Sequence, residues 1–172
     1  DSLVPALSKR ILAKAANNKN WTLQAVLSDL RGKKDAWNIL GASTSPFVTN
    51  EPPEGMGDRV NLSIVEGKRK LAKSVKAPAD ELEWDVELSA TSDRVGELSF
   101  KGVESLREVG LKVFVTVDGK TTEMHEGETL RVNLTSFAKK ATVRVAPAAK
   151  VVASFSIDAL RYVKSGANVG VT

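Results

Sequence analysis

The sequence lacks cysteine entirely and contains a single histidine, His125. The absence of thiols excludes disulfides, cysteine metal ligands and a cysteine nucleophile. One imidazole also excludes the multi-histidine zinc sites of hydrolases. His125 stands in the polar stretch 124–127, which predicts an exposed turn. Because a hydrolase needs a nucleophile, a base and an orienting group that converge, we expect no catalytic residues, no metal site and no cofactor.

Long hydrophobic runs and aromatic residues are also scarce. No stretch approaches the roughly 18 apolar residues that cross a membrane, so we expect no membrane insertion. Aromatic residues make up 5% of the 172 residues, and the three tryptophans are Trp21, Trp37 and Trp84. Hydrophobic residues of all kinds make up 42%. This content is enough for one domain whose core consists mainly of valine, leucine, isoleucine and alanine.

Charge is balanced rather than concentrated. The net charge is +4, and the one basic run lies within residues 67–76, where Lys68, Arg69, Lys70 and Lys73 stand. Such a run can bind a polyanion, for example an acidic polysaccharide. It can also lie on an edge strand, where lysines discourage pairing with another sheet, and we favour this interpretation. A nucleic-acid binder usually gathers its basic residues on one face, so we expect no nucleic-acid partner.

What the chain does contain is a series of short segments in which apolar and polar residues alternate. This is the period of a strand with one buried and one wet face, and it is clearest in residues 60–64, 82–88, 130–134 and 142–145. Asp118 and Gly119 predict a primed hairpin turn, and residues 125–128 predict the next turn. About nine such strands predict an all-β fold with little helix, an antiparallel two-sheet sandwich of immunoglobulin-like or jelly-roll kind.

The inward phase of these strands predicts the core. Its members are Trp21, Leu23, Val60, Leu62, Ile64, Leu82, Trp84, Val86, Leu88, Leu98, Phe100, Leu111, Val113, Val115, Leu130, Val132, Leu134, Val143 and Val145.

An irregular stretch, residues 43–58, interrupts the pattern. Its three prolines forbid a central strand, and a loop this long is either functional or packed as an Ω-loop. Trp37 and Phe47 border it and are candidates for binding a carbohydrate. We favour a core position for Trp37 and a plug of the loop for Phe47. The candidate ligand-binding residues are therefore these two aromatics together with Lys68, Arg69, Lys70 and Lys73, and the candidate ligand is a polysaccharide.

Acidic residues form two groups that could carry chemistry. Glu81, Glu83, Asp85 and Glu87 recur at period two and share the polar face of one strand. They could act as a catalytic pair, but we favour a wet outer face whose charges meet lysines of the next strand. Oxygen ligands for calcium are available in and near the irregular stretch, at Asn50, Glu51, Glu54, Asp58, Asp35 and Asn38. No spacing like that of an EF-hand accompanies them, so we expect no metal.

The two ends of the chain differ from the middle. We divide the sequence into an N-terminal segment 1–19 (a hairpin strand or a helix), a β-domain 20–148 and a C-terminal segment 149–172 (a strand or a linker to a following module). In the last segment, apolar residues alternate at Val151, Ala153, Phe155 and Ile157. An unpaired strand of this kind can add to the sheet of another chain. We therefore predict an assembly strand whose partners are neighbouring modules or copies of the chain, unless both ends pair internally.

The order of motifs resembles the β-sandwich modules found near the C-terminus of large secreted bacterial surface proteins. The likeness rests on a Trp-led strand, a following Asn-Ile-Leu-Gly, an irregular loop with Glu-Pro-Pro and a later Trp-Asp-Val-Glu-Leu, at residues 21–27, 37–41, 51–53 and 84–88. In such proteins an immunoglobulin-like module of the flagellar hook-capping type often follows, and residues 160–163 and 168–171 are similar to its entry. The resemblance implies a secreted or cell-surface, non-enzymatic, structural role, and it names no ligand.

Overall fold

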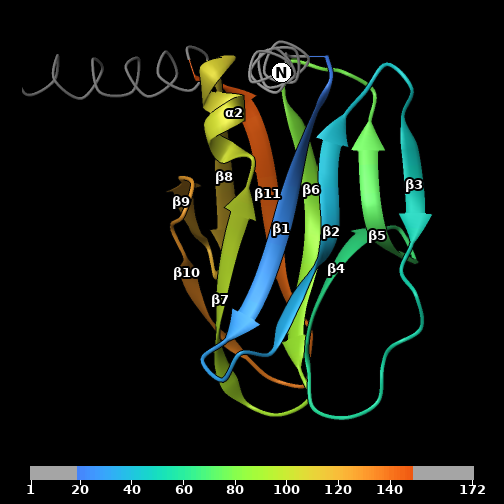
Figure 1. Ribbon diagram of the computed structural model, residues 1–172, viewed down its shortest axis with the longest axis vertical. Coiled ribbons are helices and arrows are strands. Elements are labelled where there is room, and N and C mark those ends of the chain that lie inside the picture. Colours follow the sequence, from blue (N-terminus) through green and yellow to red (C-terminus); the bar gives the residue numbers. More distant parts are fainter. Residues whose placement is uncertain (1–18, 149–172) are drawn as a thin grey trace, which may run out of the picture.

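The computed structural model describes residues 19–148, which fold into one curled β-sheet (Figure 1). The strands are β1 (Trp21–Asp29), β2 (Lys34–Ala42), β3 (Phe47–Asn50), β4 (Val60–Glu66), β5 (Arg69–Lys76), β6 (Leu82–Ala90), β7 (Arg94–Lys101), β8 (Leu111–Val117), β9 (Lys120–Met124), β10 (Leu130–Leu134) and β11 (Lys139–Pro147), with one helix, α2 (Val103–Glu108). Their order in the sheet is β10-β7-β1-β2-β5-β4-β6-β11-β8-β9, and β3 pairs with β5 beside this path.

The all-β prediction is confirmed, but the two-sheet sandwich is wrong. Ten strands follow one another in a single mixed sheet that curls into a half-barrel. The parallel ladder between β2 and β5, from Ile39–Lys73 to Ala42–Lys76, joins the two halves that a sandwich would keep apart. Alternating residues could not reveal this, because strands of a sandwich and of a barrel both have one inward face.

The core prediction is confirmed almost completely. Every predicted core residue is buried except Leu82 and Leu130, which pack against the core while partly buried. Trp21 of β1 and Trp84 of β6 meet edge to face at its centre, with ring centroids 5.8 Å apart and planes at 80°. The Trp84 indole N–H donates to Ser74 Oγ on β5 at 3.2 Å, so the buried polar end of this ring is satisfied.

The turns also follow the sequence. Asp118 and Gly119 have φ values of 53° and 75°, as a primed hairpin turn between β8 and β9 requires. The backbone N–H of Glu128 donates to the carbonyl of His125 at 3.1 Å, which closes the predicted turn after β9. One element departs from the strand pattern: β7 ends at Lys101, and the short helix α2 follows, with Leu106 fully buried.

The expectation that the basic run lies on an edge strand of the sheet is wrong. The basic run is not on an edge strand, because β5 pairs with β2, β3 and β4. The irregular stretch contains the short edge strand β3, which agrees with the prediction that its prolines exclude a central strand. The remaining loop consists of residues 51–59.

The terminal segments 1–18 and 149–172 lie outside the described residues, and with them the predicted assembly strand at Val151, Ala153, Phe155 and Ile157. Within residues 19–148, no helix is both long and apolar enough to cross a membrane.

Candidate functional site

A cleft of about 350 Å³ lies between β2, β4 and the 51–59 loop. It exists because β5 pairs with β4 over residues 69–71 and with β2 only over residues 73–76, which leaves the first halves of β2 and β4 unpaired with each other. We call it the seam cleft. It is lined by Lys34, Asp35, Trp37, Asn38, Glu51, Pro52, Pro53, Glu54, Gly55, Arg59, Val60, Asn61 and Ala72.

A β-bulge in β2 places three of these side chains. Ala25 of β1 pairs with Asn38, but Leu27 pairs with Asp35, so β2 carries one extra residue between the two pairs. Ala25 and Leu27 both face the core. Their partners Asp35 and Asn38 therefore share that face although they are three residues apart. Trp37, next to Asn38 on the strand, is 80% exposed and also lines the seam cleft.

Two carboxylates fasten the walls of the seam cleft together. Asp35 Oδ2 accepts a hydrogen bond from the backbone N–H of Leu62, 2.9 Å away on β4. Ser63 Oγ, on the same strand, donates to the Glu51 carboxylate, with its two oxygens at 3.0 and 2.8 Å. The backbone N–H of Glu51 in turn donates to the carbonyl of Lys70 at 3.1 Å. One acid thus ties β2 to β4, and the other ties the 51–59 loop to β4 and β5.

Both carboxyl groups are harder to ionise than usual. Burial raises the pKa of Asp35, against the opposing effect of hydrogen bonds from the backbone of Leu62 and Trp37. Burial also raises the pKa of Glu51; the Ser63 hydroxyl opposes this, and the neighbouring Asp35 carboxylate adds to it. The cleft therefore holds two partly desolvated negative charges that repel each other.

Asn38 adds an unsatisfied acceptor. Its side chain is 2% exposed, and its Oδ1 has no hydrogen-bond donor within residues 19–148. Buried polar atoms nearly always have a partner, so an exception needs an explanation.

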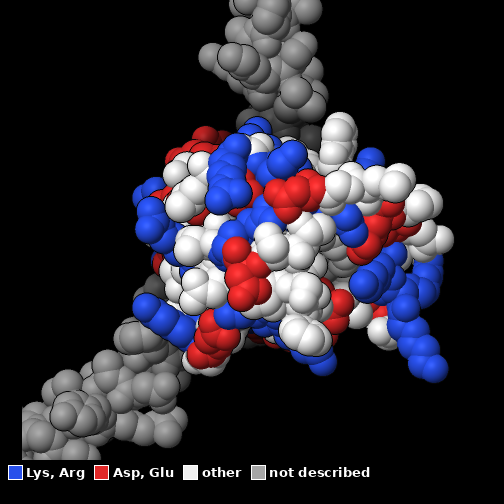
Figure 2. All heavy atoms as spheres, turned by 90° about the horizontal axis from the view of Figure 1, so that it is seen from below, with Lys and Arg blue, Asp and Glu red and all other residues white. Residues whose placement is uncertain are grey.

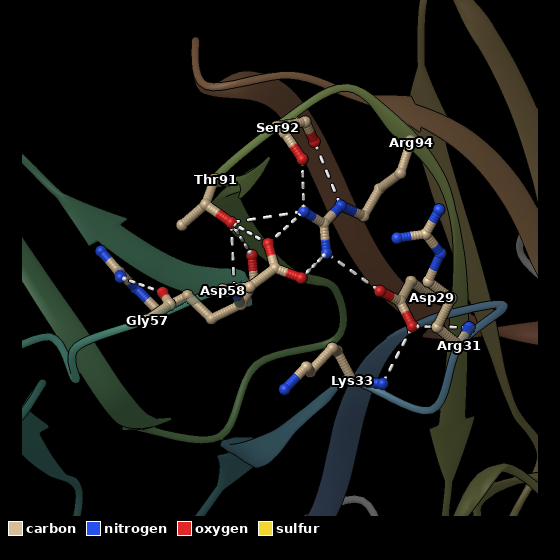
Figure 3. A network of polar contacts seen from close by, with 9 residues as sticks. Asp29, Arg31, Lys33, Gly57, Asp58, Thr91, Ser92 and Arg94 are labelled. Carbon is tan, nitrogen blue, oxygen red and sulfur yellow. Dashed lines mark hydrogen bonds and ion pairs between the residues drawn. The ribbon is translucent and has the colours of Figure 1, made fainter.

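The 51–59 loop is latched at its far end by Arg94, the first residue of β7 (Figure 3). Arg94 Nη1 donates to Asp29 Oδ2 and to Asp58 Oδ2, both at 3.0 Å, and Nη2 bonds Asp58 Oδ1. Asp29 Oδ1 accepts from the backbone N–H groups of Arg31 and Lys33 at 2.8 and 2.9 Å. One guanidinium therefore joins the end of β1, the 51–59 loop and β7.

This latch lies at the loop end of the half-barrel. Figure 2 views that end and shows acidic and basic side chains next to one another, with uncharged surface between them. The pairing of Arg94 with Asp58 and Asp29 is an instance of this mixed pattern.

The predicted ligand-binding residues lie around β5. Both favoured alternatives for the aromatics are wrong: Trp37 is exposed rather than in the core, and Phe47 is 51% exposed on β3 rather than a plug of the loop. Because β2 and β3 both pair with β5, Trp37, Phe47 and the exposed Lys73 stand on three neighbouring strands. Only Trp37 among the predicted ligand-binding residues lines the seam cleft.

The basic residues and the other acids have ordinary surface positions. Lys68, Arg69 and Lys70 are exposed at the β4–β5 hairpin, and Arg69 donates to Asn50 Oδ1 at 3.0 Å. His125 lies in its turn between Glu123 and Glu128, at 3.1 and 2.7 Å.

Three of the four acids, Glu83, Asp85 and Glu87, belong to β6, and Glu81 directly precedes the strand. Glu81 pairs with Arg144 of β11 at 2.8 Å, and Asp85 accepts from Thr142 at 3.4 Å. On the neighbouring strand β11, both a lysine and an arginine stand across from these acids, because Lys140 pairs with Glu87 and Arg144 pairs with Glu83 in the ladder.

None of three comparisons, with protein-family models, with curated protein sequences and with solved structures, finds a match for this chain. The resemblance to modules of bacterial surface proteins therefore stays a prediction, and the function of the seam cleft is inferred from its geometry.

One consequence of the raised pKa of Asp35 is testable by substitution. The pKa of Asp35 is higher in the folded chain than in the unfolded chain. At a pH above the folded-state pKa, the ionised carboxylate therefore lowers the free energy of unfolding. This loss disappears as the pH falls below the pKa of the unfolded chain. Asp35→Asn keeps an acceptor for the Leu62 N–H. We expect it to raise the free energy of unfolding at pH 7 slightly, by less than about 1 kcal/mol, and the gain to be smaller at pH 4, close to the unfolded pKa of about 3.9.

Urea unfolding of the variant and of the unmodified chain at pH 7 and pH 4 measures the two free energies of unfolding. Glu108→Gln, which removes an exposed acid of α2, serves as the control and should change neither value. A clear loss of stability in Asp35→Asn at pH 7 would show that the ionised carboxylate stabilises the seam.

Proposed function

We propose that this chain is a non-enzymatic binding module that holds a glycan in the seam cleft, against Trp37. The observation that carries the proposal is the 80% exposure of the Trp37 indole at a cleft lined by Asp35, Asn38 and Glu51. An exposed aromatic residue alone is ordinary on a protein surface, but one that lines a cleft together with a few polar groups has the usual composition of a ligand-binding site.

The two kinds of group in the cleft match the two faces of a sugar. The apolar C–H face of a pyranose ring packs on an indole, which combines a broad apolar surface with a polar edge. Its hydroxyl groups donate hydrogen bonds, and the carboxylates and the Asn38 carbonyl oxygen accept them. A few polar groups beside an apolar platform are the usual composition of a small-molecule site.

The anchoring of the 51–59 loop supports the same conclusion. Glu51 bonds Ser63 at one end of the loop, and Asp58 bonds Arg94 at the other. Between them Arg59 pairs with Glu54 at 2.6 Å. A wall ordered before binding reduces the conformational entropy that binding would otherwise cost.

Trp37 and Phe47 on strands that flank β5 provide room for more than one sugar unit. The basic hairpin at Lys68, Arg69 and Lys70 lies at the start of β5, where it could meet an acidic polymer. A structural role in a secreted or cell-surface bacterial protein, with neighbouring modules or copies of the chain as partners, is compatible with glycan binding. That role rests on the resemblance and on the terminal segments, and it stays a prediction.

The direct test is a glycan array probed with the full chain, followed by calorimetry on the oligosaccharides that bind. Trp37→Ala should weaken binding at least about tenfold, as expected for loss of an aromatic anchor, and Trp37→Phe should retain part of the affinity. Phe137→Ala is the matched control, because Phe137 is 83% exposed and does not line the seam cleft. The proposal fails if no glycan binds, or if Trp37→Ala binds as the unmodified chain does.

A further inference from the structure

The polar lining of the seam cleft is dominated by acceptors. Asp35 and Glu51 present carboxylates, and Asn38 presents an amide oxygen that has no donor among the described residues. Of the cations that line the cleft, Arg59 bonds Glu54 Oε2 at 2.6 Å and the Gly57 carbonyl at 3.1 Å. The other, Lys34, stands exposed at the first position of β2.

Such a lining suits a ligand that brings both positive charge and several N–H donors. Two neighbouring carboxylates that are partly removed from water gain most from a cation placed between them. An ammonium group offers three donors, and unlike a hydroxyl group it also brings a full positive charge to the two carboxylates. The face of a tryptophan also attracts a cation.

We propose that the seam cleft selects glycans that carry a free amino group, with the ammonium of a 2-amino sugar held between Asp35 and Glu51 and its ring against Trp37. This inference rests on the proposed glycan binding and adds the chemical class of the glycan. A hydroxyl or an N-acetyl group at the same position would bring no positive charge to the two carboxylates.

A metal ion is a poorer match for the same groups. Calcium takes six to eight oxygen ligands, and within residues 19–148 no three His, Cys, Asp or Glu side chains converge as a metal-binding group. The cleft offers two carboxylates and one amide oxygen, together with an exposed aromatic ring that a metal ion does not need.

The test compares a glucosamine hexamer with an N-acetylglucosamine hexamer, by calorimetry on the full chain at a pH where the amines are protonated and with EDTA present. We expect the amino oligomer to bind at least about tenfold more tightly, as charge-assisted hydrogen bonds imply. Asp35→Asn with Glu51→Gln should abolish this preference, whereas Trp37→Ala should weaken the amino oligomer without inverting the preference. Each single acid variant is measured as well, so that a fold defect of the double variant does not decide the result.

The matched control is Glu104→Gln with Glu108→Gln, which removes two exposed acids of α2. The control changes the net charge by the same amount as the double acid variant. Because α2 lies at the end of the half-barrel opposite the 51–59 loop (Figure 1), the control should keep the preference for the amino oligomer. Equal affinity for both hexamers would overturn the inference and leave the proposed function standing. So would a preference that is lost equally in the α2 variant. Binding of no glycan at all would overturn the proposed function itself.

Discussion

Replacing Trp84 with alanine is expected to lower the free energy of unfolding by about 3–5 kcal/mol, the usual cost of removing a buried aromatic side chain. Trp84 is 1% exposed and packs edge to face on Trp21. Because these rings come from the two halves of the curled sheet, the cavity would form where the halves meet. The substitution would also remove the donor to Ser74 Oγ, which leaves a fully buried hydroxyl with one partner fewer.

Trp37→Ala provides the matched control, because the same change is made at a side chain that is 80% exposed. It should alter the free energy of unfolding by less than about 0.5 kcal/mol. Urea unfolding followed by far-UV circular dichroism measures both variants. If the two variants lost similar stability, the assignment of Trp84 to the core and of Trp37 to the surface would be wrong.

Arg94→Met is expected to lower the melting temperature by several degrees and to weaken glycan binding. The Arg94 side chain is 13% exposed and is paired with Asp29, whose side chain is 2% exposed. Its removal leaves that carboxylate with backbone donors only, and a buried charge without its counter-charge is costly. It also frees Asp58 and with it the 51–59 loop, so a glycan would have to order one wall of the seam cleft on binding.

The same variant should change the response to acid. Hydrogen bonds from Arg94 and Thr91 lower the pKa of Asp58. Burial alone would raise the pKa of Asp29, but the backbone N–H groups of Lys33 and Arg31 together with Arg94 lower it. Lowered folded-state pKa values give stability that is present above the unfolded value of about 3.9 and is lost as the pH falls below it.

In Arg94→Met, stability should therefore fall less steeply between about pH 5 and pH 2 than in the unmodified chain. Arg59→Met is the control, because Arg59 pairs with the more exposed Glu54. At pH 7 it should lower the free energy of unfolding clearly less than Arg94→Met does. Its stability should also decrease between about pH 5 and pH 2 as steeply as that of the unmodified chain. An unchanged slope in Arg94→Met would contradict the role assigned to the latch.

The parts of the fold that depend on one strand at a time could be predicted from the sequence. Alternation identified the buried face of nearly every strand, and Asp118-Gly119 identified a hairpin because its backbone needs positive φ at both positions. The connection between strands could not be predicted in this way. The parallel ladder of β2 with β5 joins residues 34 positions apart, such as Ile39 and Lys73, and no local pattern encodes such a pairing.

The candidate site was predicted in pieces for a similar reason. Asp35, Asn38 and Glu51 were recognised as oxygen-bearing residues, but the β2 bulge that turns Asp35 and Asn38 to one face is visible only in the β1–β2 register. The interpretation of Trp37 was wrong because Trp37 and Ile39 share the outer phase of β2: Asn38 and Leu40 are buried, whereas Ile39 is only partly buried. Arg94 and Asp58 are 36 residues apart, and nothing near either residue signalled that they pair.

The most direct measurement of the central claim is the response of the three indole N–H signals in the ¹H–¹⁵N spectrum of the full chain. The chain is titrated with the glucosamine hexamer and, in a second sample, with the tightest-binding neutral oligosaccharide of the array. Trp21 and Trp84 are buried, and Trp37 is exposed at the seam cleft. We predict that the Trp37 signal, assigned by its loss in Trp37→Phe, shifts progressively and saturates while the other two remain in place. A bound glycan that leaves the Trp37 signal unmoved would contradict the account.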